Sequence, residues 1–208
     1  MQRGLMIDTG RNYLTPTVIK MAIDTMAYTK LNLLHWHIVD DECALPHIPP
    51  AIVRMPPSAW LVLLRLLLPR LRLVADPSPL CPVRSFPLQS KALPKLAGDG
   101  AFSPKHTYTL EDVSDIVAYA KERGVAVLPE LDMPGHSTSW QRGYQQISSN
   151  CSSSGSGDLS AATASGFTTP MDPTANATYK LLDTLLEELD PLFPSAFPFW
   201  HLGGDEVQ

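Results

Sequence analysis

The most constraining feature of this sequence is an alternation of short apolar runs, most of them ending in an acidic residue, with longer stretches of helical spacing. Short apolar runs bounded by turn signals are typical of strands buried on both faces, as in parallel sheets whose strands are joined by helices. The runs are "RGLMIDTG", "LNLLHWHIVDD", "VAVLPELD" and "FPFWHLGGDE". This order predicts an α/β fold, a partial TIM (β/α)8 barrel of about the first four strands.

Three helices are expected between these runs, in "YLTPTVIKMAIDTMAYTK", "YTLEDVSDIVAYAKERG" and "NATYKLLDTLLEELDPLF". Thr15 is suited to cap the first helix, because a threonine hydroxyl accepts from the unpaired N–H groups of a first turn. Thr109 and Asp112 have the spacing of a capping box, and Gly124 closes that helix. Pro191 stops the third helix, since proline cannot continue the backbone hydrogen bonds.

Acidic residues gather where a barrel of this kind carries its functional side chains, at the carboxyl ends of the strands. These residues are Asp8, Asp40, Asp41, Asp132, Asp205 and Glu206. Arg11 follows the first run and places a cation in this acidic mouth, and His136 lies in the loop after the third run. Hydrogen bonds from arginine, aspartate and histidine fit a neutral, hydroxyl-rich substrate such as a sugar.

The pair Asp205–Glu206 follows Gly203 and Gly204, which allow the backbone to pass close to a ligand. A conventional retaining glycosidase holds two carboxyl groups about 5–5.5 Å apart across the scissile bond. Adjacent residues on a strand point in different directions, so this pair suits a division of labour instead. The alternative is a tight turn with two solvated acids.

The segment "HWHIVDD" places His35 and His37 on one face of a strand and Trp36 on the other. We interpret the two histidines as core residues that pack inside the barrel. The rival hypothesis is a metal site, which would require a carboxylate and a further histidine, His136 or His201. Chelator-sensitive activity would favour that metal-dependent hydrolase.

Composition excludes several classes of protein. The formal net charge is −5, which argues against a nucleic-acid partner. No window reaches the roughly 18 apolar residues of a membrane span, and the amino terminus has no apolar run of signal-peptide length. Three cysteines are an odd number, so at least one has no partner within the chain. Sequons at Asn150 and Asn176 would be glycosylated only in a secretory compartment.

The segment from Glu42 to Arg84 differs abruptly in composition from the rest. It holds nine of the twenty prolines and lacks lysine, glycine and threonine. Prolines at this frequency break long helices and central strands, although 58–68 could form a short helix. We interpret 42–84 as an anomalous Pro/Leu/Arg-rich insertion outside the ordered barrel, arising from a retained intron or a gene-model error. An ordinary inserted subdomain is the alternative.

The remaining sequence resembles a known family. The blocks "RGLMIDTGRNYL", "MAYTKLNLLHWHIVDD", "SFPLQSKALPKL", "GAFSPKHTYTLEDVSDIVAYAKERGVAVLPELDMPGHSTSW" and "HLGGDEV" occur in the order seen in the catalytic barrel of the β-N-acetylhexosaminidases, glycoside hydrolase family 20. The resemblance covers nearly all of residues 1–208 except the insertion. It implies release of terminal non-reducing β-linked GlcNAc or GalNAc from glycans, glycolipids or chitooligosaccharides, with the substrate's 2-acetamido group as nucleophile.

By this resemblance Glu206 is the general acid/base and Asp205 orients the acetamido group. Arg11 would bind sugar hydroxyls, and Asp40, Asp132 and His136 would line the site. No metal or cofactor is implied, the partner is a glycan ending in N-acetylhexosamine, and the expected location is lysosomal, vacuolar or secreted.

The chain departs from the family pattern in ways that affect its expected activity. The insertion interrupts a short loop, and the barrel strands of the family continue beyond the fourth. Cys151 resembles a family cysteine whose disulfide partner lies beyond the signature. We therefore expect the 208-residue chain to be poorly active by itself, with an inactive truncated product as the alternative, and its exposed strand edges to favour aggregation.

Overall fold

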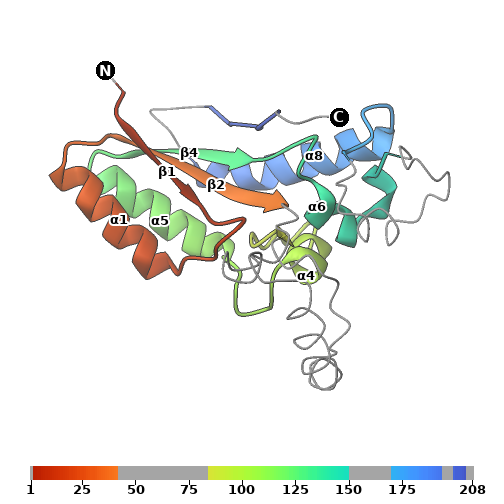
Figure 1. Ribbon diagram of the computed structural model, residues 1–208, viewed down its shortest axis with the longest axis horizontal. Coiled ribbons are helices and arrows are strands. Elements are labelled where there is room, and N and C mark those ends of the chain that lie inside the picture. The colour runs from red at the N-terminus through yellow and green to blue at the C-terminus, as the bar shows by residue number, and fades with distance from the viewer. Residues whose placement is uncertain (1, 42–83, 150–169, 194–198, 205–208) are drawn as a thin grey trace, which may run out of the picture.

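The computed structural model describes residues 2–41, 84–149, 170–193 and 199–204 (Figure 1). Several predictions lie outside these described residues. They concern most of the insertion 42–84, most of the loop 148–169, Asn150, the three cysteines Cys43, Cys81 and Cys151, and the pair Asp205 and Glu206.

The centre of the fold is a parallel sheet, as the sequence predicts. Its strands are β1 (Gly4–Asp8), β2 (Leu33–Asp41) and β4 (Ala126–Leu131), and β2 lies between the other two. The register aligns Met6 with His35 and His35 with Leu128, so the three strands end at the same edge of the sheet (Figure 1). Strand order and direction are those of successive strands in a (β/α)8 barrel.

The described part of the predicted fourth strand forms a bridge and not a continuous ladder. Among residues 199–204, parallel pairing is confined to one bridge between His201 and Glu130. The His201 N–H donates to the Pro129 carbonyl at 3.0 Å, and the Leu131 N–H donates to the His201 carbonyl at 3.1 Å. These bonds place the segment beside β4, in the position that the sequence predicts.

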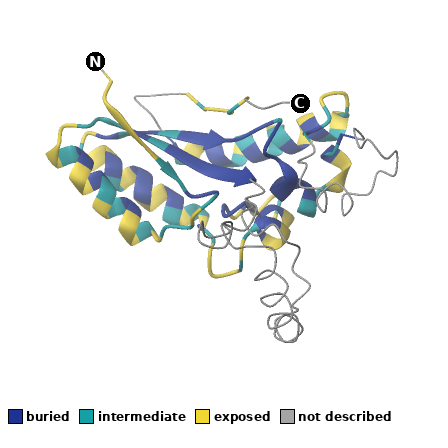
Figure 2. Ribbon diagram, in the orientation of Figure 1, coloured by how far each residue is buried: buried dark blue, intermediate teal, exposed yellow. Residues whose placement is uncertain are grey.

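The first strand is less buried than its apolar sequence suggests. Leu5 and Met6 are exposed, whereas Leu34 and Trp36 of β2 are fully buried (Figure 2). The reason is the position of β1 in the sheet. Among the described strands it pairs only with β2, so its other edge has no neighbour to cover its side chains.

The three predicted helices are present with the predicted caps. They are α1 (Pro16–Tyr28), α5 (Leu110–Glu122) and α8 (Asn176–Leu189). The Thr15 hydroxyl accepts from the Val18 N–H, and both hydrogen bonds of the capping box of α5 form. Helices α1 and α5 lie side by side against the sheet (Figure 1), and ion pairs join Lys20 to Asp115 and Asp24 to Arg123.

Short elements at the carboxyl end of the sheet were not predicted. They are β3 (Arg84–Ser85), which pairs antiparallel with the end of β2, α4 (Lys95–Gly100), α6 (Thr138–Gly143) and the 3-10 turns η1 (Gln145–Ile147) and η2 (Asp190–Leu192). Phe86 packs edge-on against Trp140, with ring centroids 4.9 Å apart. This contact holds α6 over the end of β2.

The core lies between the sheet and the helices. Its largest fully buried side chains include Trp36, Trp140, Tyr108, Phe86, Ile19, Ile23 and Met26. Within the parts of the chain that the structure describes, no helix has the length and apolarity needed to cross a membrane.

The two faces of α1 supply a test of this packing. Ile23 is fully buried, and Met21 on the same helix is 63% exposed. We expect Ile23→Ala to lower the free energy of unfolding by about 2–5 kcal/mol, because it leaves a cavity in the core. Met21→Ala should change it by no more than about 0.5 kcal/mol. Urea unfolding of the two variants measures the difference, and equal effects would contradict the packing described here.

Candidate active site

The acidic residues that the sequence places at the strand ends meet at one edge of the sheet. Asp8 ends β1, Asp40 and Asp41 end β2, and Asp132 follows β4. Asp40, Asp41 and Asp132 are buried. Buried carboxylates are costly unless they are paired or hydrogen-bonded, so such a cluster requires cations nearby.

Arg11 supplies one of these cations. Its Nη1 lies 2.8 Å from Asp8 Oδ2, and its Nη2 lies 2.9 Å from Asp40 Oδ2. The backbone N–H of Arg11 also donates to Asp8 Oδ1 at 2.9 Å. The guanidinium is held by carboxylates from two strands, while its side chain stays 31% exposed. It is therefore a fixed cation that still faces the mouth of the site.

Gly10 allows this arrangement because the loop after β1 touches the backbone of β2. A Cβ atom at Gly10 would lie 2.5 Å from the Asp40 nitrogen and 2.7 Å from the Asp40 Cβ. Real Cβ atoms do not approach backbone atoms this closely. Glycine at this position therefore sets the distance between Arg11 and Asp40.

His136 supplies a second cation. Its Nδ1 donates to Asp40 Oδ1 at 3.0 Å and approaches the Asp41 carbonyl at 3.2 Å. The backbone of His136 is left-handed, with φ of 49°, a conformation that costs a non-glycine residue about 1 kcal/mol or more. The hydrogen bond to Asp40 raises the pKa of His136 to about 10, although burial opposes this shift.

Asp40 is the common partner of these cations. Its Oδ2 lies 2.7 Å from His37 Nε2 and 2.9 Å from Arg11 Nη2, and its Oδ1 accepts from His136. Burial alone would raise the pKa of Asp40. Hydrogen bonds from His136 and His37 and the charge of Arg11 outweigh burial and hold that pKa below its usual range. Asp40 is therefore an anion across the physiological range.

Asp132 lies against the glycine pair that precedes Asp205. A Cβ atom at Gly203 would lie 1.8 Å from Asp132 Oδ1, and Gly203 has φ of 69°. The Met133 N–H also donates to the Leu202 carbonyl at 2.9 Å. Four of the six predicted site residues, Arg11, Asp40, Asp132 and His136, thus lie at the carboxyl edge of the sheet, and Asp132 contacts the segment 199–204.

Glu130 is not one of the predicted site residues, and it lies on β4 opposite His37 of β2. Its Oε2 lies 2.7 Å from His37 Nδ1 and 2.5 Å from His35 Nε2, and its Oε1 lies 2.8 Å from His201 Nδ1. His35 and His37 do face the inside, as expected, but they pair with this carboxylate. The sequence signal that could have indicated Glu130 is its spacing from Asp132. Residues two apart point to the same side of an extended chain, so Glu130 would point to the same side as a predicted site residue.

Three sets of these side chains have donor atoms within 4.8 Å of one another and could approach a cation. They are His35, Glu130 and His201; Asp8, His37 and Asp40; and Asp40, Asp132 and His136. Tetrahedral ligands at zinc bond lengths are about 3.3 Å apart. In contrast, Glu130 lies 2.5–2.8 Å from its histidine partners. Glu130 and these histidines are therefore close enough to pair directly with one another.

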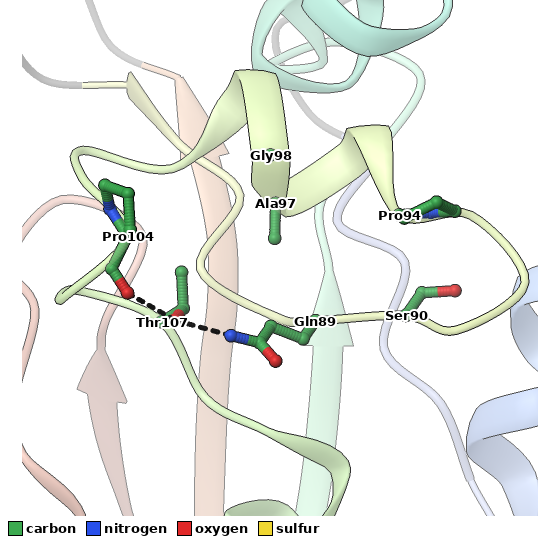
Figure 3. A pocket seen from close by; sticks show the side chains of 7 residues that line it. All are labelled: Gln89, Ser90, Pro94, Ala97, Gly98, Pro104 and Thr107. Carbon is green, nitrogen blue, oxygen red and sulfur yellow. Dashed lines mark hydrogen bonds between the residues drawn. The ribbon is translucent and has the colours of Figure 1, made fainter.

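A separate cavity of about 230 Å³ lies beside α4 (Figure 3). Gln89 and Thr107 line it, and the Gln89 amide donates to the Thr107 hydroxyl at 2.9 Å. All its lining side chains are uncharged, and none is a predicted site residue. The acid cluster at the strand ends therefore remains the candidate active site.

Comparison with known proteins identifies the family of this site. The model described as "Glycosyl hydrolase family 20, catalytic domain" matches residues 1–47 and 80–208. The chain belongs to glycosyl hydrolase family 20. The unmatched residues 48–79 lie inside the predicted insertion, whose origin remains a prediction.

Curated relatives agree with this family. The chain is 35% identical to human beta-hexosaminidase subunit beta over 206 residues, and 37% identical to beta-hexosaminidase 3 of Arabidopsis thaliana over 207 residues. Each match covers 99% of this chain but only 28% and 27% of the relatives. The chain therefore spans little more than a quarter of the length of these relatives.

Solved structures confirm the fold. Flavobacterium johnsoniae chitobiase superimposes with a TM-score of 0.66 at 29% identity, covering 99% of this chain and 24% of that one. A beta-N-acetylhexosaminidase of Bacteroides fragilis gives a TM-score of 0.63 at 26% identity, covering 99% and 32%. The prediction of a partial family 20 barrel is confirmed.

The close approach at Gly10 predicts a strong effect of one methyl group. We expect Gly10→Ala to lower the free energy of unfolding by about 1–3 kcal/mol, because the added Cβ overlaps the backbone of Asp40. The matched control is Gly98→Ala in α4, where nothing lies within 4 Å of an added Cβ. That change should stabilise by about 0.5–1 kcal/mol. Thermal unfolding that ranks the two variants in the opposite order would contradict this account.

The ion pairs also predict how stability depends on pH. His37 and His136 have raised pKa values of about 10, so their contribution is complete below about pH 6.5 and disappears as pH rises through 10. Asp40 and Glu130 have lowered pKa values, so their contribution to stability is complete above about pH 4.5 and is lost as the pH falls. Stability should be greatest between these limits and clearly lower at pH 8.5 than at pH 5.5. Urea midpoints that rise from pH 5.5 to 8.5 would contradict this.

Proposed function

We propose that this chain carries part of the active site of an exo-β-N-acetylhexosaminidase. The reaction is hydrolysis of terminal non-reducing β-linked GlcNAc or GalNAc from glycans, glycolipids or chitooligosaccharides. The observation that carries the proposal is the clamp of Arg11 between Asp8 and Asp40, at the same edge of the sheet as Asp132, which lies against Gly203 two residues before Asp205. Arg11 held in this way is a fixed hydrogen-bond donor for sugar hydroxyls, and the two carboxylates of the family signature follow Gly204 in the sequence.

The proposed mechanism uses the substrate as its own nucleophile. The carbonyl oxygen of the 2-acetamido group attacks the anomeric carbon, and Glu206 protonates the departing glycosidic oxygen. Asp205 accepts a hydrogen bond from the acetamido N–H and stabilises the positive charge of the oxazolinium intermediate. Glu206 then removes a proton from water as the water attacks the anomeric carbon, so the configuration is retained.

The described residues have positioning and binding roles in this proposal. Arg11 donates to ring hydroxyls, and Asp40 fixes both Arg11 and His136. Asp132 lies against Gly203, two residues before Asp205, and positions that part of the chain. A carboxylate-rich, partly buried site raises the pKa of an acid placed there, which suits a general acid.

The proposed compartment is a lysosome, a vacuole or the exterior of the cell. Two features support it. Asn176 of the sequon Asn-Ala-Thr is exposed at the first residue of α8, and a glycan there would meet solvent. The ion pairs of the site are also complete at mildly acidic pH.

A chimera tests the proposed activity, because the chain spans 28% of its human relative. Residues 1–208, with and without 42–84, replace the matching stretch of human beta-hexosaminidase subunit beta. We expect the form without 42–84 to hydrolyse 4-nitrophenyl N-acetyl-β-glucosaminide and its galacto epimer. Glu206→Gln should lower kcat by about 10²–10⁴-fold, because no acid then protonates the leaving group.

The control for the chimera is Glu187→Gln, an exposed position on α8 that should leave kcat unchanged. The 208-residue chain by itself should turn over little substrate. Full turnover by the Glu206→Gln chimera would refute the assignment of the general acid. Loss of turnover on adding a chelator would favour the metal-dependent alternative.

A further inference from the structure

Glu130 is a buried carboxylate of the described site to which the proposed mechanism assigns no role. It is 5% exposed and lies on β4. Its partners come from two other segments, His35 and His37 on β2 and His201 beside β4. A single carboxylate therefore joins the strand that carries Asp40 to the segment that leads into the family signature.

The geometry fixes the protonation of His37. Its Nδ1 faces Glu130 Oε2 at 2.7 Å, and its Nε2 faces Asp40 Oδ2 at 2.7 Å. Carboxylate oxygens accept hydrogen bonds, so each ring nitrogen must donate. His37 is therefore an imidazolium held between two buried anions.

The orientation of Asp40 depends on that imidazolium. Asp40 Oδ2 is shared by His37 and Arg11, and Oδ1 accepts from His136. A neutral His37 would keep one N–H and could donate to only one of its two carboxylates. If that donor turned toward Glu130, Asp40 would lose a partner and could rotate away from Arg11 and His136.

We propose that Glu130 is a positioning residue that holds Arg11 and His136 in place by acting through His37 and Asp40. It contacts no predicted substrate-binding group directly. The effect on turnover rests on the proposed hexosaminidase function, whereas the effect on the side chains does not. The titratable and charged groups that surround Glu130, His37 and Asp40 are Asp8, Asp41, Asp132, Arg11, His35, His136 and His201.

A purely structural role for Glu130 is the competing explanation, and Glu188 supplies a matched control. Its carboxylate accepts from the Lys91 N–H at 2.9 Å, the Ala92 N–H at 3.3 Å and the Ser90 hydroxyl, and so joins α8 to a distant loop. Glu188→Gln removes one negative charge from a carboxylate that also joins distant segments of the chain but lies outside the acid cluster. It should affect stability without affecting the imidazoles of the site.

The test is a pH titration of the imidazole ¹⁵N signals of His37 and His136 in the 208-residue chain. In the unmodified chain both nitrogens of His37 should remain protonated to about pH 9, because its pKa is raised to about 10. In Glu130→Gln the pKa of His37 should fall by about one unit or more, and the signals of His136 should shift. In Glu188→Gln neither should change.

Two outcomes would overturn the proposal. One is a His136 spectrum that is the same in Glu130→Gln as in Glu188→Gln. The other is a His37 pKa near 6.5 in the unmodified chain, which needs no variant and so decides the question even if Glu130→Gln does not fold. Glu130→Asp keeps the negative charge. The pKa of His37 in this variant should therefore lie between its values in the unmodified chain and in Glu130→Gln.

The chimera separates this proposal from the proposed function. If it is active, Glu130→Gln should raise KM about tenfold through Arg11 and change the pH profile, while Glu188→Gln should do neither. If the chimera is inactive but the imidazole signals respond as expected, the hexosaminidase proposal fails and the positioning role of Glu130 stands.

Discussion

The buried carboxylate of Asp40 determines how the site is arranged. A carboxylate without solvent is stable only where cations or N–H groups surround it, and this one has Arg11, His37 and His136 within 3.0 Å. Each partner comes from a different part of the chain. The loop after β1, the body of β2 and the loop after β4 therefore meet at one group, and their relative positions follow from it.

Local sequence signals were sufficient to predict the elements that carry the site. The apolar runs of β1, β2 and β4, the cap at Thr15 and the capping box at Thr109 all depend on neighbouring residues, and the structure confirms them. The carboxyl ends of parallel strands meet at one edge, so the strand order also predicted that Arg11, Asp40, Asp132 and His136 lie together.

The features that the sequence did not predict depend on contacts between distant segments. Glu130 has its role only because β2 places His35 and His37 beside it, and the spacing of Glu130 and Asp132 in "VAVLPELD" does not show that contact. The short helices α4 and α6 have too few residues for a clear helical period. The exposure of Leu5 and Met6 depends on what pairs with β1, and an apolar run alone carries no information about its neighbours.

Among the described strands β1 is paired along one edge, with β2. Whatever pairs with its other edge affects the size of the site as well as the tendency to aggregate. A barrel mouth is a ring, and its width depends on the twist between every pair of adjacent strands. In the described part of the chain, the strand pairings and the Asp40 ion pairs determine the relative positions of the segments from β1 to His201 around this ring. The opposite wall begins at whichever strand pairs with β1. The width of the mouth therefore depends on the edge of β1 as much as on the acid cluster.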